Sequence, residues 1–268
     1  MIEVRGLVHI YPDGTRAVDG VDLSIADGER LAIIGQNGSG KSTLVRHLNG
    51  LLRPTAGEIL IDGRPTADDR VAALAARVGV AFQDPDRQIF AGRVRTEVAF
   101  GPRNLGLRGA TLDAAVSSAL AAVGLADQAD RNPYDLGFSR RKLLALASVL
   151  AMGTPTLVLD EPTTGQDLRG IERIQAIVAD LSAAGRTIVA ISHDMRFVAE
   201  TFDRVAVMRE GRLVLDGTPA AVFAEASWAT LAGTYVEPPL AARTGARLGL
   251  GSTPTDAALV ARLAARTT

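Results

Sequence analysis

The chain has 268 residues, a formal net charge of −1 and no cysteine. This length allows one substantial core with room for a subdomain. The absence of cysteine excludes a disulfide framework, a zinc knuckle and thiolate chemistry, and the near-neutral charge gives no basic field that would recruit nucleic acid. Neither a signal peptide nor a membrane span is indicated, since the longest apolar run, residues 143–152, would cross half a bilayer at most. We therefore expect a cytosolic protein that does not bind nucleic acid.

The first 30 residues alternate short apolar stretches with turns, which predicts an antiparallel β layer. A buried strand is expected at residues 31–34, and a helix follows at 42–49. Shorter strands are expected at 57–63 and at 77–82. Up to this point the pattern is typical of an α/β protein whose first layer is a separate antiparallel sheet.

From residue 83 to about 150 the periodicity becomes helical, most clearly at residues 112–123 and 139–152. The remaining expected elements are strands at 156–160 and 187–191, a helix at 166–184, a hairpin at 205–215 and a helical patch near 256–265. Alternating strands and helices predict an α/β core with a parallel sheet, and the long helical stretch inside it predicts an inserted helical subdomain.

Two lysines stand against 27 arginines, and one of them, Lys41, lies in a glycine-rich segment after the first predicted buried strand. Glycines let backbone N–H groups approach phosphates, and a compact ammonium fits there where a planar guanidinium does not. The spelling is GxxxxGK[ST], the P-loop pattern. We expect this loop to bind a nucleoside triphosphate, with the Ser42 hydroxyl offered to Mg²⁺, through Gly35, Gln36, Asn37, Gly38, Ser39, Gly40, Lys41, Ser42 and Thr43.

An acidic pair, Asp160 and Glu161, ends a predicted buried strand well downstream of Lys41. An acidic residue at the carboxyl end of such a strand would face a P-loop across a parallel sheet and hold Mg²⁺ or its water shell. Glu161 is then placed to act as general base on the attacking water. In isolation an Asp-Glu pair is more often a strand-end turn, and it is the P-loop that favours the catalytic interpretation.

Three further residues are candidates with plainer alternatives. Gln83 ends a strand, where its amide would contact Mg²⁺ and the attacking water, although a loop glutamine usually faces solvent. His193 follows a strand and would hydrogen-bond the γ-phosphate, although a lone histidine there is more often structural. Tyr11 would stack on the adenine ring, or else simply pack.

Taken together, these motifs resemble the ATP-binding-cassette (ABC) ATPases, and the resemblance covers about residues 1–220. It implies an ABC ATPase core with an N-terminal antiparallel β layer and an inserted helical subdomain at about 84–152. It also implies an aromatic A-loop at Tyr11, a Q-loop at Gln83, a D-loop ending at Asp167 and a switch histidine at His193. Mg²⁺ with ATP is implied as well, as is pairing with a second ABC ATPase subunit. The family's signature region corresponds to Leu136, Gly137, Phe138, Ser139 and Arg140.

A narrower resemblance is to the energy-coupling-factor (ECF) branch of vitamin and metal importers. The segments that carry it are residues 83–90, 97–106 and 148–152. In that branch a short helix after the Q-loop meets a membrane coupling subunit. The resemblance implies a motor peripheral to the inner face of the cell membrane, working with a transmembrane coupling protein and a substrate-capturing membrane protein.

The signature departs from the family's Leu-Ser-Gly-Gly-Gln. Phe138 places a ring where the family has glycine, Ser139 is expected as a helix N-cap, and Arg140 would supply charge to phosphate or ribose. These changes predict an asymmetric heterodimer, in which this chain's own P-loop and Glu161 remain competent but the site that receives its signature is weakened. A tolerated variant that still grips phosphate is the alternative. Gln166, where the family often has leucine, has no evident consequence.

Residues 221–268 are the least informative part of the chain. By resemblance this C-terminal extension is expected to help two cassettes dimerise, whereas the prolines at 238–239 and the glycine-rich stretch at 245–251 would equally suit a partly disordered end. Rival functions are the motor of another ABC transporter type, a soluble ABC protein acting on DNA or ribosomes, and a nucleotide-gated subunit that hardly hydrolyses ATP. The transported substrate cannot be inferred, because an ABC motor does not touch it.

Overall fold

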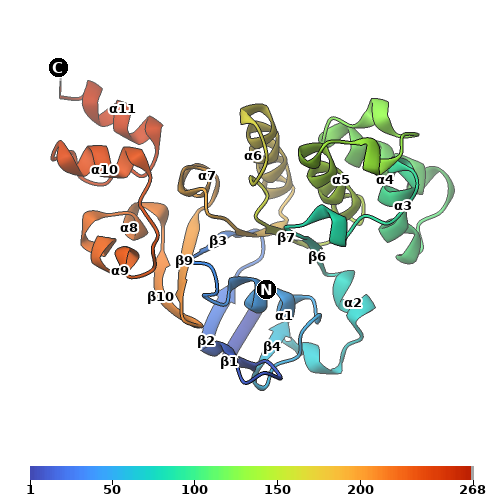
Figure 1. The fold of residues 1–268 in the computed structure, drawn as a ribbon, viewed down its shortest axis with the longest axis horizontal. Helices are drawn as coiled ribbons and strands as arrows, with labels where there is room; N and C mark the ends of the chain where they lie inside the picture. Colours follow the sequence, from blue (N-terminus) through green and yellow to red (C-terminus); the bar gives the residue numbers. More distant parts are fainter. Residues whose placement is uncertain (267–268) are drawn as a thin grey trace. The chain divides into compact units, whose positions relative to one another are not determined.

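The computed structural model describes residues 1–266 (Figure 1); Thr267 and Thr268, the last two residues of the predicted C-terminal extension, lie outside the described part. The chain divides into two compact units, each described separately below. The first unit comprises Met1–Leu48, Leu52–Asp68 and Ile191–Thr268. The second comprises Asn49–Leu51 and Asp69–Ala190.

An antiparallel sheet of order β2-β1-β4-β5 forms one layer of the first unit. Its strands are β1 (Ile2–Ile10), β2 (Arg16–Ile25), β4 (Ala56–Ile61) and β5 (Arg64–Pro65). Ile2 pairs with Ile25 on one side and with Ile61 on the other, so the apolar ends of three strands meet in one row. Burial alternates along β2 and through much of β1, as expected for a sheet with one covered face.

The glycine-rich loop that is predicted to bind a nucleotide, named the nucleotide-binding loop below, lies between β3 (Arg30–Ile34) and α1 (Lys41–Leu48) in the first unit. Strand β3 runs parallel to β9 (Arg204–Arg209), which turns back into the antiparallel β10 (Arg212–Gly217). Leu31, Ile33 and Ile34 are fully buried, as expected for a parallel strand covered on both faces.

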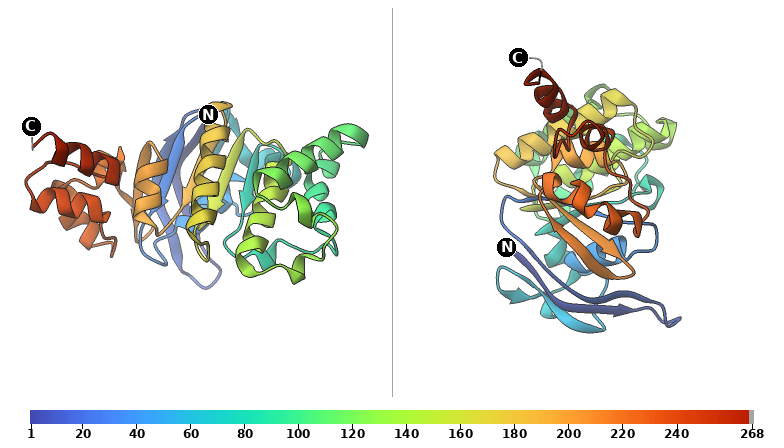
Figure 2. Two further views of the ribbon diagram at one scale, coloured as in Figure 1. Left: turned by 90° about the horizontal axis from the view of Figure 1, so that it is seen from above. Right: turned by 90° about the vertical axis from the view of Figure 1, so that its left-hand side faces the viewer.

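The end of the first unit is helical. Its helices are α7 (Met195–Thr201), α8 (Pro219–Val222), α9 (Trp228–Ala232), α10 (Leu240–Arg247) and α11 (Asp256–Ala264). Helices α10 and α11 lie side by side (Figure 2). The expectation of a partly disordered stretch is wrong here, because α10 begins directly after the two prolines and the Thr253 hydroxyl donates to the Ala241 carbonyl at 2.8 Å. Proline before a helix presets its start instead of preventing it.

The second unit combines a parallel strand group with a helical group. Strand β7 (Thr156–Asp160) lies between β6 (Val78–Ala81) and β8 (Thr187–Ile191), and every residue of these strands is buried. The helices are α2 (Val71–Ala75), α3 (Val94–Asn104), α4 (Gly109–Ala122), α5 (Phe138–Leu150) and α6 (Leu168–Ala183).

Helix α5 is the centre of the helical group, since α3 and α4 both pack against it. All eight residues from Lys142 to Val149 are buried, so this helix has no solvent face along its middle. The α/β class predicted from the sequence, with an antiparallel β layer and a helical subdomain, is confirmed. No helix within residues 1–266 combines the length and the apolar character needed to cross a bilayer.

Candidate functional site

The nucleotide-binding loop is shaped by two glycines that touch other backbone segments of the first unit. A Cβ on Gly35, at φ +143°, would lie 2.2 Å from the Met208 carbonyl oxygen. A Cβ on Gly40, at φ +101°, would lie 2.2 Å from the Ala17 carbonyl oxygen. Only glycine fits at either position, because backbone cannot yield as a flexible side chain can. The loop is therefore held between β2 and β9.

The β9–β10 turn fastens the same loop. The Gly211 N–H donates to the Ser39 carbonyl at 3.0 Å, and the Asp19 N–H donates to the Gly211 carbonyl at 2.9 Å. Among residues 1–266, the Ser39 hydroxyl is one of the few buried side-chain groups with no hydrogen-bond partner. A buried hydroxyl left in this state is costly unless a ligand satisfies it, and a phosphate oxygen would do so.

The Lys41 ammonium folds back over the loop and donates to the carbonyls of Gly35 at 2.7 Å and Gln36 at 2.8 Å. Its side chain is only 6% exposed, and it begins α1, whose free N–H groups favour an anion. Ser42 is half-buried on the same first turn, while Asn37 and Gly38 are exposed at the tip of the loop. These features suit a polyphosphate with its Mg²⁺.

Tyr11 is tied to the helix that follows the loop. Its hydroxyl lies 3.0 Å from the Thr43 hydroxyl, and its ring meets the His9 ring edge-on at 4.6 Å between centroids. His9 in turn contacts His47 of α1, with the His9 Nδ1 and the His47 Nε2 3.0 Å apart. The tyrosine ring is thus held beside the first turn of α1, half-exposed. Its stacking on adenine stays a prediction.

His193 lies in the same unit, in the short link between β8 and α7. Partial burial lowers the pKa of its imidazole, and the positive charge of Lys41 lowers it further. A neutral imidazole can donate one hydrogen bond to a phosphate oxygen while its other nitrogen accepts one. The link is held by Asp194, whose carboxylate caps α7 by accepting from the Phe197 N–H at 3.0 Å.

The acidic pair belongs to the second unit. Asp160 is the last residue of β7, and Glu161 follows with its backbone in the left-handed region at φ +52°. Both side chains are buried, at 6% and 4% exposure. A non-glycine residue rarely takes this conformation, and it is typical of sites where a side chain must be aimed.

Gln83 is exposed two residues after the end of β6, also in the second unit. The strand end beneath it is fixed by Gln88, which the sequence did not single out. The side-chain Oε1 of Gln88 accepts from the Phe82 N–H at 3.1 Å, and its side-chain amide donates to the Ala145 carbonyl of α5 at 2.7 Å. The loop after Gln83 is thereby attached to the helix that carries the signature.

The predicted N-cap at Ser139 is wrong. Gly137 takes that position, with no side-chain cap, and α5 begins at Phe138. The Ser139 hydroxyl instead donates to the side-chain Oε1 of Gln166 at 2.8 Å, and the side-chain amide of Gln166 donates to the backbone carbonyl of Ser139 at 3.1 Å. From the sequence, Gln166 had no evident role. In the structure it is hydrogen-bonded to Ser139, which is another residue that differs from the family's pattern. Leu136 is buried, Arg140 is exposed, and Asp167 caps α6.

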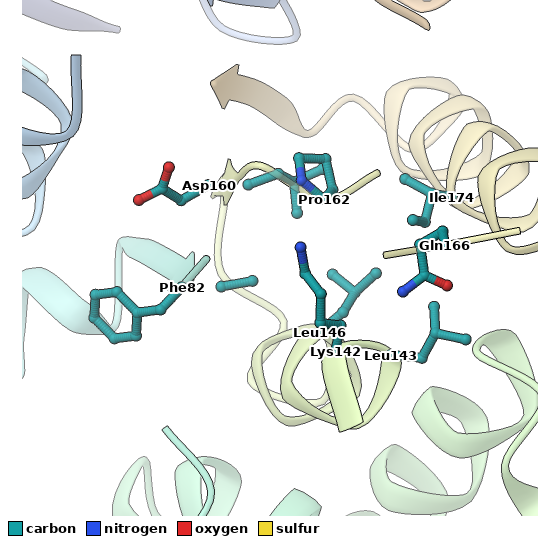
Figure 3. Close-up of a pocket in the computed structure, with 10 residues that line it drawn as sticks. Phe82, Lys142, Leu143, Leu146, Asp160, Pro162, Gln166 and Ile174 are labelled. Atoms are coloured by element: carbon teal, nitrogen blue, oxygen red, sulfur yellow. The ribbon is translucent and has the colours of Figure 1, made fainter. Parts of the chain in front are cut away.

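Lys142 was missed by the sequence analysis, although lysine is rare in this chain and that rarity had drawn attention to Lys41. It is the other lysine of the chain and is 7% exposed. Its ammonium reaches from α5 toward Pro162, in the segment that follows β7 (Figure 3), and donates to the Glu161 carbonyl. Burial lowers its pKa, and the charges of Glu161 and Asp160 oppose that shift.

A glycine-rich loop that follows a parallel strand, begins a helix with lysine and serine, and accompanies an acidic strand end defines a P-loop nucleoside triphosphatase. The family model described as "ABC transporter" matches residues 18–164. The chain belongs to the ATP-binding proteins of ABC transporters, of the energy-coupling-factor type, and is an ATPase.

Two relatives and one solved structure illustrate the match. The chain is 43% identical to the energy-coupling factor transporter ATP-binding protein EcfA of Methanothermobacter thermautotrophicus, over 84% of this chain and 73% of the relative. It is 42% identical to the cobalt import ATP-binding protein CbiO of Rhodobacter capsulatus, over 90% of this chain and 86% of the relative. The structure of cbiO1 from Clostridium perfringens, part of the ABC transporter complex cbiONQ, has a TM-score of 0.76 and 38% identity, over 86% of this chain and 93% of that one.

Proposed function

We propose that this chain is the ATP-hydrolysing motor of an ECF-type importer for a vitamin or a transition-metal ion. It works on a membrane coupling protein at the inner face of the cell membrane, together with a substrate-capturing membrane protein. Membership in the family supports this proposal, as do relatives named for energy coupling and for cobalt import. The observation that carries it is an apolar groove in the second unit.

The residue roles are proposed as follows. Lys41 and the loop N–H groups hold the phosphates, Glu161 takes a proton from the attacking water or orients it, and His193 contacts the γ-phosphate. Mg²⁺ bound with ATP would neutralise charge that develops on the phosphoryl oxygens. Ser42, Gln83 and Asp160 are the residues proposed to hold it, and their hydroxyl, amide and carboxylate oxygens are the ligands that Mg²⁺ prefers.

The groove has a volume of about 260 Å³ and is lined mainly by apolar side chains from α2, β6, α3 and α5. Phe90 and Phe100 stand at it with their rings edge to face, 4.7 Å apart between centroids, and are 60% and 49% exposed. The buried Glu97 carboxylate fixes the Phe90 segment by accepting from the N–H groups of Phe90 at 3.0 Å and Ala91 at 2.8 Å. Exposed aromatic rings over a preformed apolar groove are typical of a protein-docking site.

The proposed occupant is a short amphipathic helix of the coupling protein. Such a helix would place its apolar face on Phe90 and Phe100, beside Phe82, which immediately precedes Gln83. Movement of that helix would then displace Gln83, which is proposed to contact Mg²⁺. This arrangement supports coupling between the nucleotide state and the membrane partner.

The test is to express the candidate transporter genes together and to purify the complex through a tag on this chain. Phe90→Ala and Phe100→Ala together should reduce recovery of the membrane subunit, since truncating central aromatic anchors costs on the order of 2 kcal/mol or more. Binding of ATP should stay unchanged. Tyr235→Ala is the matched control, because Tyr235 is an aromatic residue that is 85% exposed in the other unit. Full recovery with both phenylalanines removed would exclude the groove as the docking site.

A second proposal concerns the partner cassette. The Phe138 ring lies against Gly165 of its own chain and is 43% exposed. A ring at this position in the signature favours pairing with a different ATPase subunit that carries the family's usual signature.

A further inference from the structure

The start of α5 and the loop after β7 are fastened together within the second unit. We name this set of contacts the clasp: Phe138, Ser139 and Lys142 on α5, with residues 161–166 of the loop. Two of its members, Ser139 and Gln166, are positions where the chain departs from its family, and Phe138 is a third. Because these residues differ from the family's pattern and also lie in one set of contacts, we infer that they share a role.

Lys142 makes the central contacts of the clasp. Its ammonium donates to the Glu161 carbonyl and, at 3.1 Å, to the Thr164 carbonyl. The same ammonium lies 6.0 Å from the centroid of the Phe138 ring, within range of a cation–π interaction. A charged donor to a carbonyl gives a stronger hydrogen bond than a neutral one. The backbone oxygen of the proposed general base is thus held by a buried cation.

The remaining contacts hold residues 161–166 against the start of α5, beside the Lys142 ammonium. A Cβ on Gly165, at φ +75°, would lie 2.8 Å from two carbons of the Phe138 ring, so the ring rests on the glycine backbone. The reciprocal hydrogen bonds between Ser139 and Gln166 fasten the far end of the loop. Lys142 and Gln166 both line a cavity of about 20 Å³, which leaves room for little more than one water molecule (Figure 3).

We propose that Lys142 is a positioning residue for ATP hydrolysis, which holds Glu161 in its left-handed backbone conformation and so aims the Glu161 carboxylate. The inference rests on the proposed role of Glu161 as general base. It adds a residue that is not among those proposed to hold the nucleotide or Mg²⁺ and that acts through the Glu161 carbonyl. It also links the signature segment of this chain to the chain's own catalytic carboxylate.

The physical reason is the cost of the Glu161 conformation. A non-glycine residue at φ +52° is strained, and it persists only where surrounding contacts determine it. The Thr164 N–H also donates to the Glu161 carbonyl, but at 3.4 Å this contact is longer than a typical N–H···O hydrogen bond. Without the ammonium the peptide could relax, and a displacement of about 1 Å at a catalytic group can cost about 10²-fold in rate.

The test measures hydrolysis by the transporter complex purified through this chain. Lys142→Met should lower kcat by about 10²-fold while the Kd for ATP changes little, because the lysine contacts backbone carbonyls and is not among the residues proposed to hold the nucleotide. Lys142→Gln keeps a neutral donor and should lower kcat less, and it carries the test if Lys142→Met does not fold. Arg173→Met is the matched control, since the Arg173 guanidinium also donates to a backbone carbonyl, that of Val123 at 3.0 Å. It should lower Tm and leave kcat unchanged.

A double variant separates positioning from a general structural effect. In a Glu161→Gln background, Lys142→Met should lower the residual rate no further, because the group that it positions is already gone. Folded Lys142 variants with the wild-type kcat would overturn the inference, as would losses that multiply in the double variant. If Glu161→Gln alone hydrolyses ATP at the wild-type rate, the proposed role of Glu161 fails instead.

Discussion

Two residues of the proposed site should fail in different ways when they are replaced. Lys41→Ala should abolish ATP binding, because it removes the ammonium that folds over the loop and is proposed to hold the phosphates. Glu161→Gln should bind ATP and stall, because the amide cannot take a proton from water. Nucleotide binding by fluorescence and hydrolysis by phosphate release check both outcomes. A Glu161→Gln protein that turns over normally would exclude it as the base.

The buried His47, whose ring contacts that of His9, should make stability depend on pH. Burial lowers the pKa of His47 below its ordinary value of 6.5, and the His9 ring lowers it further. On acidification, His47 therefore binds a proton more readily in the unfolded chain than in the folded chain. Its contribution to stability is full above about pH 6.5 and falls as the pH drops below that value. The His47 Nδ1 lies 2.7 Å from the Thr43 carbonyl, and a neutral ring can donate there while its Nε2 accepts from His9.

The measurement is Tm between about pH 7.5 and pH 5.5, where Tm should fall. His47→Gln keeps an amide donor without the titrating group and should flatten this dependence. A Tm that rises on acidification of the wild-type chain would contradict the assignment.

At the scale of single residues, the sequence identified side chains by local pattern and missed those defined by distant contacts. Ser139 satisfied the rule for an N-cap, yet its hydroxyl bonds Gln166, a partner that no local rule selects. Lys142 could have been found by the rarity of lysine alone, but its partners, two backbone carbonyls, have no signature in a sequence.

At the scale of elements, the two clamped glycines of the nucleotide-binding loop allow a direct test. Gly40→Ala should weaken ATP binding strongly, because its Cβ would meet the Ala17 carbonyl at 2.2 Å. Gly38→Ala is the control in the same loop: it shares a positive φ, +80°, but its Cβ would meet nothing within 4 Å. Gly38→Ala should cost only the backbone strain of about 1–2 kcal/mol. Equal losses of ATP affinity, measured by titration calorimetry, would mean that the clamp has no part in shaping the loop.

Strands were predicted more closely than helix ends. Residues 156–160 and 187–191 form β7 and β8 with the expected bounds, because each is a short buried run of β-forming residues between breakers. Helix α6 begins at Leu168 and not at residue 166, because the Asp167 carboxylate accepts from the Gly170 N–H at 2.8 Å and sets the cap there. Helices α2 and α10 are too short, at 5 and 8 residues, to show a clear period.

At the scale of the whole molecule, the predicted observable is pairing with a second cassette. The mass of purified Glu161→Gln, measured by light scattering with and without MgATP, distinguishes the two proposed arrangements. We expect a monomer that binds ATP and does not self-associate, because the Phe138 ring occupies the signature. An ATP-dependent homodimer would show that Leu136–Arg140 still functions as a signature, and the asymmetric heterodimer would be excluded.

Both lysines of the chain are buried, Lys41 at 6% and Lys142 at 7% exposure, so neither is open to an amine-acylating reagent in the closed protein. Each becomes reactive only when its own surroundings open: the nucleotide-binding loop for Lys41 and the clasp for Lys142. Acylation rates followed by mass spectrometry would therefore report the opening of the two segments separately, in one sample and without any engineered label. MgATP should lower the acylation rate of Lys41 directly. Any change in the acylation rate of Lys142 would show that nucleotide binding alters the opening of the clasp.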